Sequence, residues 1–265
     1  MDQITFAAVP DLPLIHPGDD LARIVFERMQ AAGMALQDGD VLLVAQKVVS
    51  KCEGRLVRLR DVQPTARAIE LSAVTEHDPR LDELILQESN EILKVRKGLL
   101  IVGQRTGFIC ANAGIDRSNI EPDDGEIVVS LLPLDPDASA RRLRQQLRQF
   151  SGADVAVLII DTHGRPFRNG VCGVTIGVAG MKALRDARGE IDLFGFTLQH
   201  TIISPADELA AGASALMGQS SEGRPVVLVR GAHYQRGEGS VQELIRPRDQ
   251  DLFRPEPVMR LTGDR

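Results

Sequence analysis

Short apolar runs divide the chain at residues 41–45, 155–160 and 225–229. Continuous apolar runs of this length, bounded by turn residues, are typical of strands that are buried on both faces. Residues 99–102 and 106–110 flank a short polar turn, which predicts a hairpin. A glycine-rich stretch over 170–180 predicts a further buried strand, in which glycine lets another backbone pack closely.

Helical spacing of apolar residues predicts four helices among these strands, over residues 21–30, 79–97, 138–150 and 205–217. Gly98 is placed to cap the second helix, while Asp135 and Ser204 are placed to open the third and fourth. Because helices and strands do not alternate regularly, we expect an α+β fold with mixed or antiparallel sheets and flanking helices. We expect one domain over residues 1–245, with room for two interleaved subdomains, and a charged peripheral tail over residues 246–265.

The composition narrows the classes of function. The chain has 265 residues, a formal net charge of −6, and only 3% aromatic residues. This balance is poorly suited to gripping a phosphate backbone or stacking bases, so we expect no nucleic-acid partner. No apolar run reaches the roughly 18–20 residues needed to span a bilayer, and the N-terminus shows no secretory signal pattern. Three cysteines without CxxC spacing indicate reduced thiols, so we expect a cytoplasmic protein with no membrane partner.

Four polar segments carry candidate chemistry. Asp161 and Thr162 follow the run 155–160 and supply the hard oxygens that Mg²⁺ or Mn²⁺ prefers, although Asp161 could equally begin a turn. The loop 112–119 offers an aspartate and two amides, in a pattern that ordinary turns also show. Residues 50–55 offer Lys51 to a phosphate, and the small polar loop 217–224 offers backbone N–H groups. The sequence has no P-loop and no HExxH, GxSxG or kinase signature.

Taken in order, these segments are more specific than any one of them alone. The matching stretches are LPLI (12–15) followed by PGDDL (17–21), VVSKCEGR (48–55), NAGIDRSN (112–119), LLPLDPDASA (131–140), DTHGRPFRNGVCGVTIGVAG (161–180), ADELAAGASALMGQ (206–219) and VVLVRG (226–231). Together they resemble the coenzyme F420:L-glutamate ligase family over roughly residues 10–235, which is nearly the whole chain.

The resemblance implies GTP-dependent amide ligation. Members of the family add L-glutamate to the lactyl-phosphate carboxylate of the deazaflavin coenzyme and then extend a γ-linked glutamate tail. They use Mg²⁺ or Mn²⁺ at two sites, are helped by K⁺, and form homodimers with an unusual α+β fold. The expected mechanism activates the acceptor carboxylate as an acyl phosphate, which the glutamate amine attacks with release of GDP and phosphate.

The resemblance also implies roles for individual residues. Asp116 and Asp161 correspond to ligands of one metal, and Thr162 and Gln219 to ligands of a second. Lys51 joins Asp116 and Asp161 as a residue implied in catalysis, because phosphoryl transfer needs charge neutralisation. The implied GTP site comprises Leu12, Pro13, Leu14, Ile15, Gln46, Lys47, Lys51, Asn119, Met217, Gly218, Gln219, Ser220, Ser221, Glu222, Gly223 and Arg224. We expect Arg165 and Arg168, beside the proposed metal ligands, to meet an anionic substrate.

The chain departs from the family pattern at several points. Gln46 and Lys47 stand where members often carry small hydroxyl residues, and Gln219 is neutral where some relatives have Glu. The chain stops soon after the ligase region, so we expect a stand-alone ligase without the nitroreductase-like domain of some bacterial relatives. Two other interpretations stay open: the same chemistry on another carboxylate acceptor, and a nucleotide-binding regulator without catalysis.

Overall fold

The computed structural model describes residues 3–122 and 124–261, and their contacts divide the chain into two units. One unit takes in the chain up to Cys52 together with Asp135–Leu244, and the other takes in Glu53–Leu134 and the chain from Ile245. The first unit is therefore discontinuous in sequence. Its helices are α1 (Leu21–Ala31), α2 (Gln46–Cys52), α5 (Pro136–Ser151) and α6 (Pro205–Met217).

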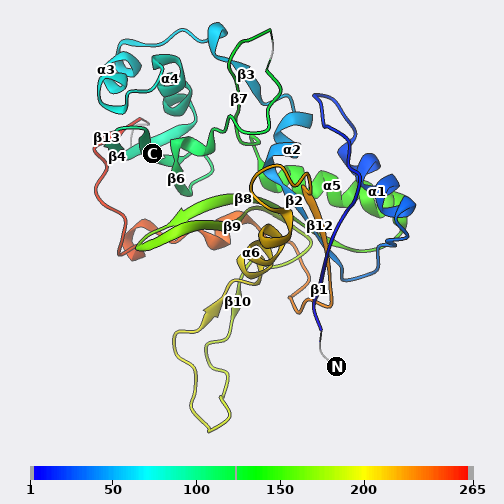
Figure 1. Cartoon of the computed structure of the whole chain (residues 1–265). Helices are drawn as coiled ribbons and strands as arrows, with labels where there is room; N and C mark the ends of the chain where they lie inside the picture. The colour runs from blue at the N-terminus through cyan, green and yellow to red at the C-terminus, as the bar shows by residue number, and fades with distance from the viewer. Residues whose placement is uncertain (1–2, 123, 262–265) are drawn as a thin grey trace. The chain divides into compact units, whose positions relative to one another are not determined.

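A five-stranded sheet forms the framework of the first unit (Figure 1). Its β2 and β8 are parallel neighbours, and the other neighbouring strands are antiparallel. β2, β12 and the first half of β8, as far as Ile160, are almost entirely apolar, as expected of strands covered on both faces. The strand order is β1 (Thr5–Ala8), β12 (Val226–Arg230), β2 (Val41–Ala45), β8 (Ala156–Arg165) and β9 (Arg168–Ala179).

Helices cover both faces of this sheet. α6 packs on one face, in a cluster of buried residues that includes Val41, Leu43 and Leu158. The alternate residues Leu42 and Ile159 point to the opposite face and are equally buried. α1 and α5 form the layer on that side (Figure 1). The sheet is thus sandwiched between helices, which explains why its strands lack the alternation of a half-exposed sheet.

The glycine-rich stretch lies in β9, as the sequence predicts. Two of its glycines allow two different helices to pack closely against this strand. A Cβ on Gly173 would lie 2.4 Å from the backbone oxygen of Ala210 in α6. A Cβ on Gly177 would lie 2.6 Å from the backbone oxygen of Pro136 in α5. A register shift beside Ile159 places one extra residue in β9 between these two glycines, so residues four apart face opposite sides.

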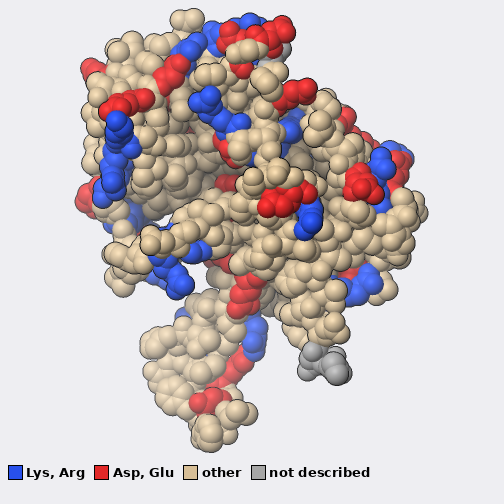
Figure 2. All heavy atoms as spheres, viewed as in Figure 1, with Lys and Arg blue, Asp and Glu red and all other residues tan. Residues whose placement is uncertain are grey.

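A long arm leaves the first unit between β10 (Arg185–Asp186) and β11 (Ile202–Ile203) (Figure 1). Backbone hydrogen bonds continue along it, from Ala187 N to Thr201 O and from Asp192 N to Phe196 O. The surface of the arm is mostly uncharged in the view of Figure 2. Four large apolar side chains near its end are exposed: Ile191, Leu193, Phe194 and Phe196.

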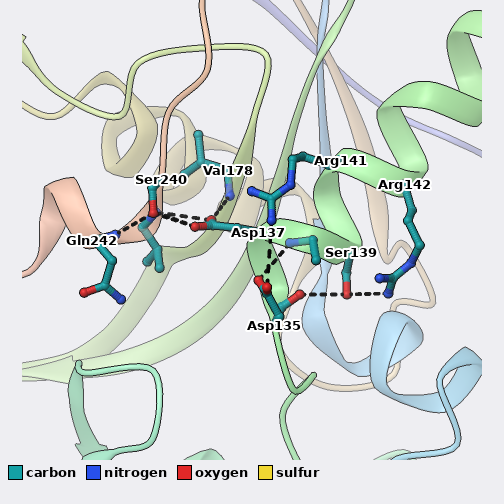
Figure 3. Close-up of polar contacts among 10 residues, drawn as sticks. Asp135, Asp137, Ser139, Arg141, Arg142, Val178, Ser240 and Gln242 are labelled. Carbon is teal, nitrogen blue, oxygen red and sulfur yellow. Dashed lines mark hydrogen bonds and ion pairs between the residues drawn. The ribbon is translucent and has the colours of Figure 1, made fainter.

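Asp137 ties three segments of the first unit together (Figure 3). Its buried carboxylate lies in the first turn of α5 and accepts the backbone N–H of Val178 in β9 at 2.8 Å. The Ser240 hydroxyl donates to the same carboxylate at 2.6 Å, and the Val241 N–H donates at 3.1 Å. A negative charge at the N-terminus of a helix is favourable, and here hydrogen bonds also satisfy it fully.

The second unit contains two smaller sheets. Both are antiparallel: one pairs β3 (Leu56–Arg58) with β7 (Val128–Ser130), and the other has four strands. Ile85, Ile92 and Leu100 are buried in a core beside the larger sheet. That sheet has the order β13 (Met259–Arg260), β4 (Ser89–Arg96), β5 (Leu99–Gln104) and β6 (Ile109–Ala111), and the helices are α3 (Ala66–Thr75) and α4 (Pro79–Gln87).

The C-terminal segment, expected to be peripheral, is built into the second unit. β13 pairs with β4, and Arg248 and Arg254 both donate to the buried carboxylate of Glu91. Burial alone would raise the pKa of Glu91, but the two guanidinium groups lower it below its ordinary value. The segment therefore supplies both a strand and a charge partner to this unit.

The α+β prediction is confirmed, as are the predicted apolar strands, the hairpin of β5 and β6, and three of the four helices. The single helix predicted over 79–97 is wrong. α4 ends at Gln87, and the chain continues as β4, which pairs with β5 across a tight turn. Gly98 has a φ of 70° in that turn rather than at a helix end. Tertiary pairing overrides the helix propensity of residues such as Leu93 and Lys94.

Candidate functional site

Thr162 in β8 and Gln219 after α6 meet although they are far apart in sequence. The Thr162 hydroxyl donates to the side-chain oxygen of Gln219 at 3.0 Å. The Gln219 amide nitrogen donates in turn to the Ser214 hydroxyl at 2.9 Å, which fixes which way the amide faces. α6 therefore presents an oxygen of Gln219 to the oxygen of Thr162.

This pair suits a hard cation. Mg²⁺ and Mn²⁺ prefer hydroxyl, amide and carboxylate oxygens, and two such oxygens already converge here. Within the described parts of the chain, no group of three or more His, Cys, Asp or Glu side chains is arranged to hold a metal ion. The donors of this pair are neutral, so carboxylates or phosphates of a substrate would have to balance the charge of a bound cation.

Asp161 lies on the other face of β8. Neighbouring residues of a strand point to opposite faces, so Asp161 shares its face with His163 and not with Thr162. The His163 Nε2 and the Asp161 Oδ2 are 3.2 Å apart, and each side chain keeps 16% of its surface exposed. The interpretation of residues 161–164 as a turn is wrong, because β8 continues through them to Arg165 while paired with β9.

The loop after α6 follows a glycine that ends the helix. Gly218 has φ 76° and ψ −178°, which is a conformation that other residues adopt only with strain. The Ser220 N–H donates to the Glu222 carboxylate at 2.8 Å. Hydrogen bonds from backbone N–H groups, that of Ser220 foremost, hold the pKa of Glu222 below its ordinary value. The loop therefore directs the Ser220 N–H to one anionic group, whose charged form the surrounding backbone favours.

The other predicted GTP contacts of the first unit come from its N-terminal half. Residues 12–15 lie between β1 and α1, with Leu14 at 75% exposure and Ile15 buried at 5%. α2 starts directly where β2 ends, so Gln46 and Lys47 occupy its first turn and Lys51 its last. Gln46 is buried and its side-chain oxygen accepts the Ser50 hydroxyl at 2.9 Å. A nucleotide contact from Gln46 would therefore involve its backbone.

Asp116 and Asn119 belong to the second unit. Asp116 exchanges two backbone hydrogen bonds with Ser130, which holds it beside the end of β7. Its carboxylate accepts the Ser118 N–H at 2.7 Å in a tight local turn. Asn112 is structural, because its side-chain oxygen accepts the Leu100 N–H at 2.8 Å. Asp116 and Asp161, predicted to share a metal, thus lie in different units.

Arg165 and Arg168 flank the turn that joins β8 to β9. The Arg165 Nε is buried and, within residues 3–122 and 124–261, is one of two buried side-chain polar atoms without a hydrogen-bond partner. A buried donor without a hydrogen-bond partner is unfavourable in free energy, so this guanidinium is suited to donating to an anionic ligand. Arg168 is exposed beside Phe167, which is itself 90% exposed.

Sequence reasoning missed Ser214, which orients Gln219. A serine within a helix carries no local signal of such a role, and the two residues are five apart across the helix end.

Among the described residues, none of the helices has the length and apolar character needed to span a membrane.

Comparison with known proteins agrees with the resemblance. The F420-0:gamma-glutamyl ligase family matches residues 11–231, which include residues of both units. Coenzyme F420:L-glutamate ligase of Methanothermobacter thermautotrophicus is 44% identical over 253 residues, covering 95% of this chain and 99% of the relative. The enzymes of the same name from Methanopyrus kandleri and Archaeoglobus fulgidus are 45% and 43% identical, covering 91% and 93% of this chain and 93% and 94% of their own lengths. The chain therefore belongs to the F420-0:gamma-glutamyl ligase family.

Proposed function

We propose that this chain is a GTP-dependent ligase that joins L-glutamate to the lactyl-phosphate carboxylate of the F420 precursor and then extends a γ-linked tail. The observation that carries the proposal is identity above 40% to enzymes named coenzyme F420:L-glutamate ligase along more than 90% of the chain. The convergence of Thr162 and Gln219 supports it, because these oxygens suit the divalent metal that phosphoryl transfer needs.

The proposed reaction has two steps. An oxygen of the acceptor carboxylate attacks the γ-phosphorus of GTP, the bond to the β-phosphate oxygen breaks, and GDP leaves. The amine of L-glutamate then attacks the acyl carbon, loses a proton, and expels inorganic phosphate as the amide forms. Without this activation, amide formation would have to expel hydroxide from the carboxyl carbon. The acyl phosphate expels phosphate instead, which is a much better leaving group.

Residues of the chain have distinct parts in this proposal. Bound Mg²⁺ or Mn²⁺ would supply charge neutralisation for the phosphates, with Thr162 and Gln219 as ligands at one site. Asp116 and Asp161 are each proposed as further metal ligands. Lys51 adds a positive charge for the phosphates. The loop 217–224 contributes backbone N–H groups, and Arg165 holds the anionic acceptor.

Mass spectrometry of the reaction tests the proposal. The purified protein is incubated with the glutamate-free coenzyme, L-glutamate, GTP and Mn²⁺, and each component is omitted in turn. We expect mass steps of one glutamate that vanish without GTP or metal. ATP in place of GTP tests the nucleotide, and NaCl in place of KCl tests the proposed stimulation by K⁺. Products with another carboxylate acceptor alone would favour the same chemistry on a different substrate, and acceptor-independent GTP binding without product would favour a regulator.

We also propose that the chain acts as a cytoplasmic homodimer. The exposed apolar side chains Leu193 and Phe194 of the arm, at 97% and 95% exposure, support a surface that a second copy covers. Light scattering on the purified protein is expected to give twice the mass of 28.9 kDa. The double variant Leu193→Asp with Phe194→Asp is expected to give the monomer mass.

A further inference from the structure

The carboxylate of Glu222 lies where an anionic ligand of the loop would lie. The Ser220 N–H donates to it at 2.8 Å. This hydrogen bond, together with the neighbouring backbone N–H groups of Glu222 itself and of Gln219, favours the charged form of the carboxylate and lowers its pKa. Neighbouring N–H groups that converge on one point form an anion-binding concavity, as they do around phosphates. Here the chain fills that concavity with its own side chain.

Gly218 makes room for this arrangement. A Cβ on Gly218 would lie 2.1 Å from the carboxyl carbon of Glu222 and 2.5 Å from both of its oxygens. A glycine is therefore favoured at this position for two reasons: its positive φ, and the space that the Glu222 carboxylate occupies where a Cβ would lie. Glu222 is otherwise exposed.

Gln219 connects this concavity to the Thr162–Gln219 oxygens. Its backbone N–H contributes to the lowered pKa of Glu222, while its side-chain oxygen accepts the Thr162 hydroxyl. A phosphate in place of the carboxylate would thus be adjacent to the oxygens proposed to hold a cation. Nucleotide phosphates and their metal are bound by this kind of neighbouring pair of sites.

We propose that the Glu222 carboxylate is an internal substitute for a nucleotide phosphate, and that it must leave the backbone N–H groups of residues 219–222 before that phosphate binds. This inference rests on the proposed use of GTP. It assigns Glu222 a role opposite to that of an ordinary contact residue, since the side chain competes with the nucleotide. The loop then has two states, one closed by Glu222 and one occupied by phosphate.

Such competition lowers the apparent affinity for nucleotide by a calculable factor. If the carboxylate holds the N–H groups about nine-tenths of the time, only about one-tenth of the molecules are competent to bind, and the apparent dissociation constant is about ten-fold higher. Removing the carboxylate should therefore tighten binding by roughly five- to ten-fold.

Calorimetric titration with GTP, and separately with inorganic tripolyphosphate, tests the inference in the presence of Mg²⁺ and without acceptor or glutamate. Glu222→Gln keeps the length of the side chain and removes its charge. Glu222→Asp keeps the charge but is one methylene too short to reach the Ser220 N–H. Glu27→Gln, an exposed position of α1, makes the same charge change away from the loop.

We expect both Glu222 variants to bind GTP and tripolyphosphate more tightly than the unmodified protein, and Glu27→Gln to bind as the unmodified protein does. Unchanged or weaker binding by Glu222→Gln would overturn the inference while leaving the proposed function intact. Tighter binding by Glu222→Gln with unchanged binding by Glu222→Asp would also overturn it, because simple charge repulsion would then explain the gain. Absence of GTP binding by every form would contradict both this inference and the proposed function.

Discussion

Replacing Thr162 with valine distinguishes a metal ligand from a structural hydroxyl. Valine has nearly the same shape and an equally good preference for strands, so β8 should keep its pairing. The structure shows one hydrogen bond to lose, the bond of 3.0 Å to Gln219 at a partly exposed position. Loss of one such bond costs about 0.5–1.5 kcal/mol of the free energy of unfolding. If Thr162 were purely structural, Thr162→Val would therefore lower the melting temperature by a few degrees and leave the metal requirement unchanged.

If Thr162 binds the metal, Thr162→Val should change the metal requirement of the reaction, and by more than the loss of one hydrogen bond would. Even partners that only orient metal ligands change metal affinity or activity by about 10- to 100-fold when they are removed. We expect Thr162→Val to raise the Mg²⁺ or Mn²⁺ concentration for half-maximal ligation by at least about ten-fold. The assay measures the rate of glutamate addition by mass spectrometry over a series of metal concentrations, beside thermal unfolding without metal.

Thr5→Val is the matched control, because Thr5 is an exposed residue of the outer strand β1 in the same sheet. It makes the same chemical change away from Gln219, and we expect a normal metal requirement. A Thr162→Val variant with the metal requirement of the unmodified protein would refute the assignment of Thr162 as a ligand.

Three further predictions concern stability. Asp137→Asn should lower the free energy of unfolding by about 2–4 kcal/mol in denaturant titration, because one oxygen that accepts N–H or O–H donors is replaced by a donor. Unfolding at an unchanged denaturant concentration would contradict the buried role of Asp137. Gly173→Ala should cost about 1–3 kcal/mol by the same measurement, because its Cβ would meet backbone of α6 that cannot move aside. The lowered pKa of Glu91 means that its ion pairs with Arg248 and Arg254 stabilise the second unit fully above the ordinary value of 4.5 and progressively less as the pH falls through the lowered pKa. Glu91→Gln should therefore destabilise the protein more at pH 7 than at pH 3, and an equal loss at both would refute this.

The sequence alone determined where several elements begin and end, because those signals are local. The Asp135 side chain accepts the Ala138 N–H and the Ser204 side chain accepts the Asp207 N–H, so α5 and α6 start where the capping residues predict. Gly152 ends α5 in a left-handed conformation. A cap depends on four or five neighbouring residues, and it can therefore be recognised without knowledge of the fold.

The resemblance to a family supplied the candidate site residues, while their arrangement came only from the fold. Thr162 and Gln219 lie 57 positions apart and meet because α6 packs across β9 onto the same face as Thr162. Asp161, its neighbour in sequence, points to the other face because strands alternate. Spacing along the chain shows neither relation.

Tertiary structure also decided the cases in which local preference was ambiguous. Residues 89–96 include good helix formers, yet they form β4 because β5 and β13 offer hydrogen-bond partners on either side. β8 continues through Asp161 because β9 pairs with it to the hairpin turn. In both segments the free energy of pairing with a distant strand exceeds the small propensity differences between residues, and no sequence window contains that partner.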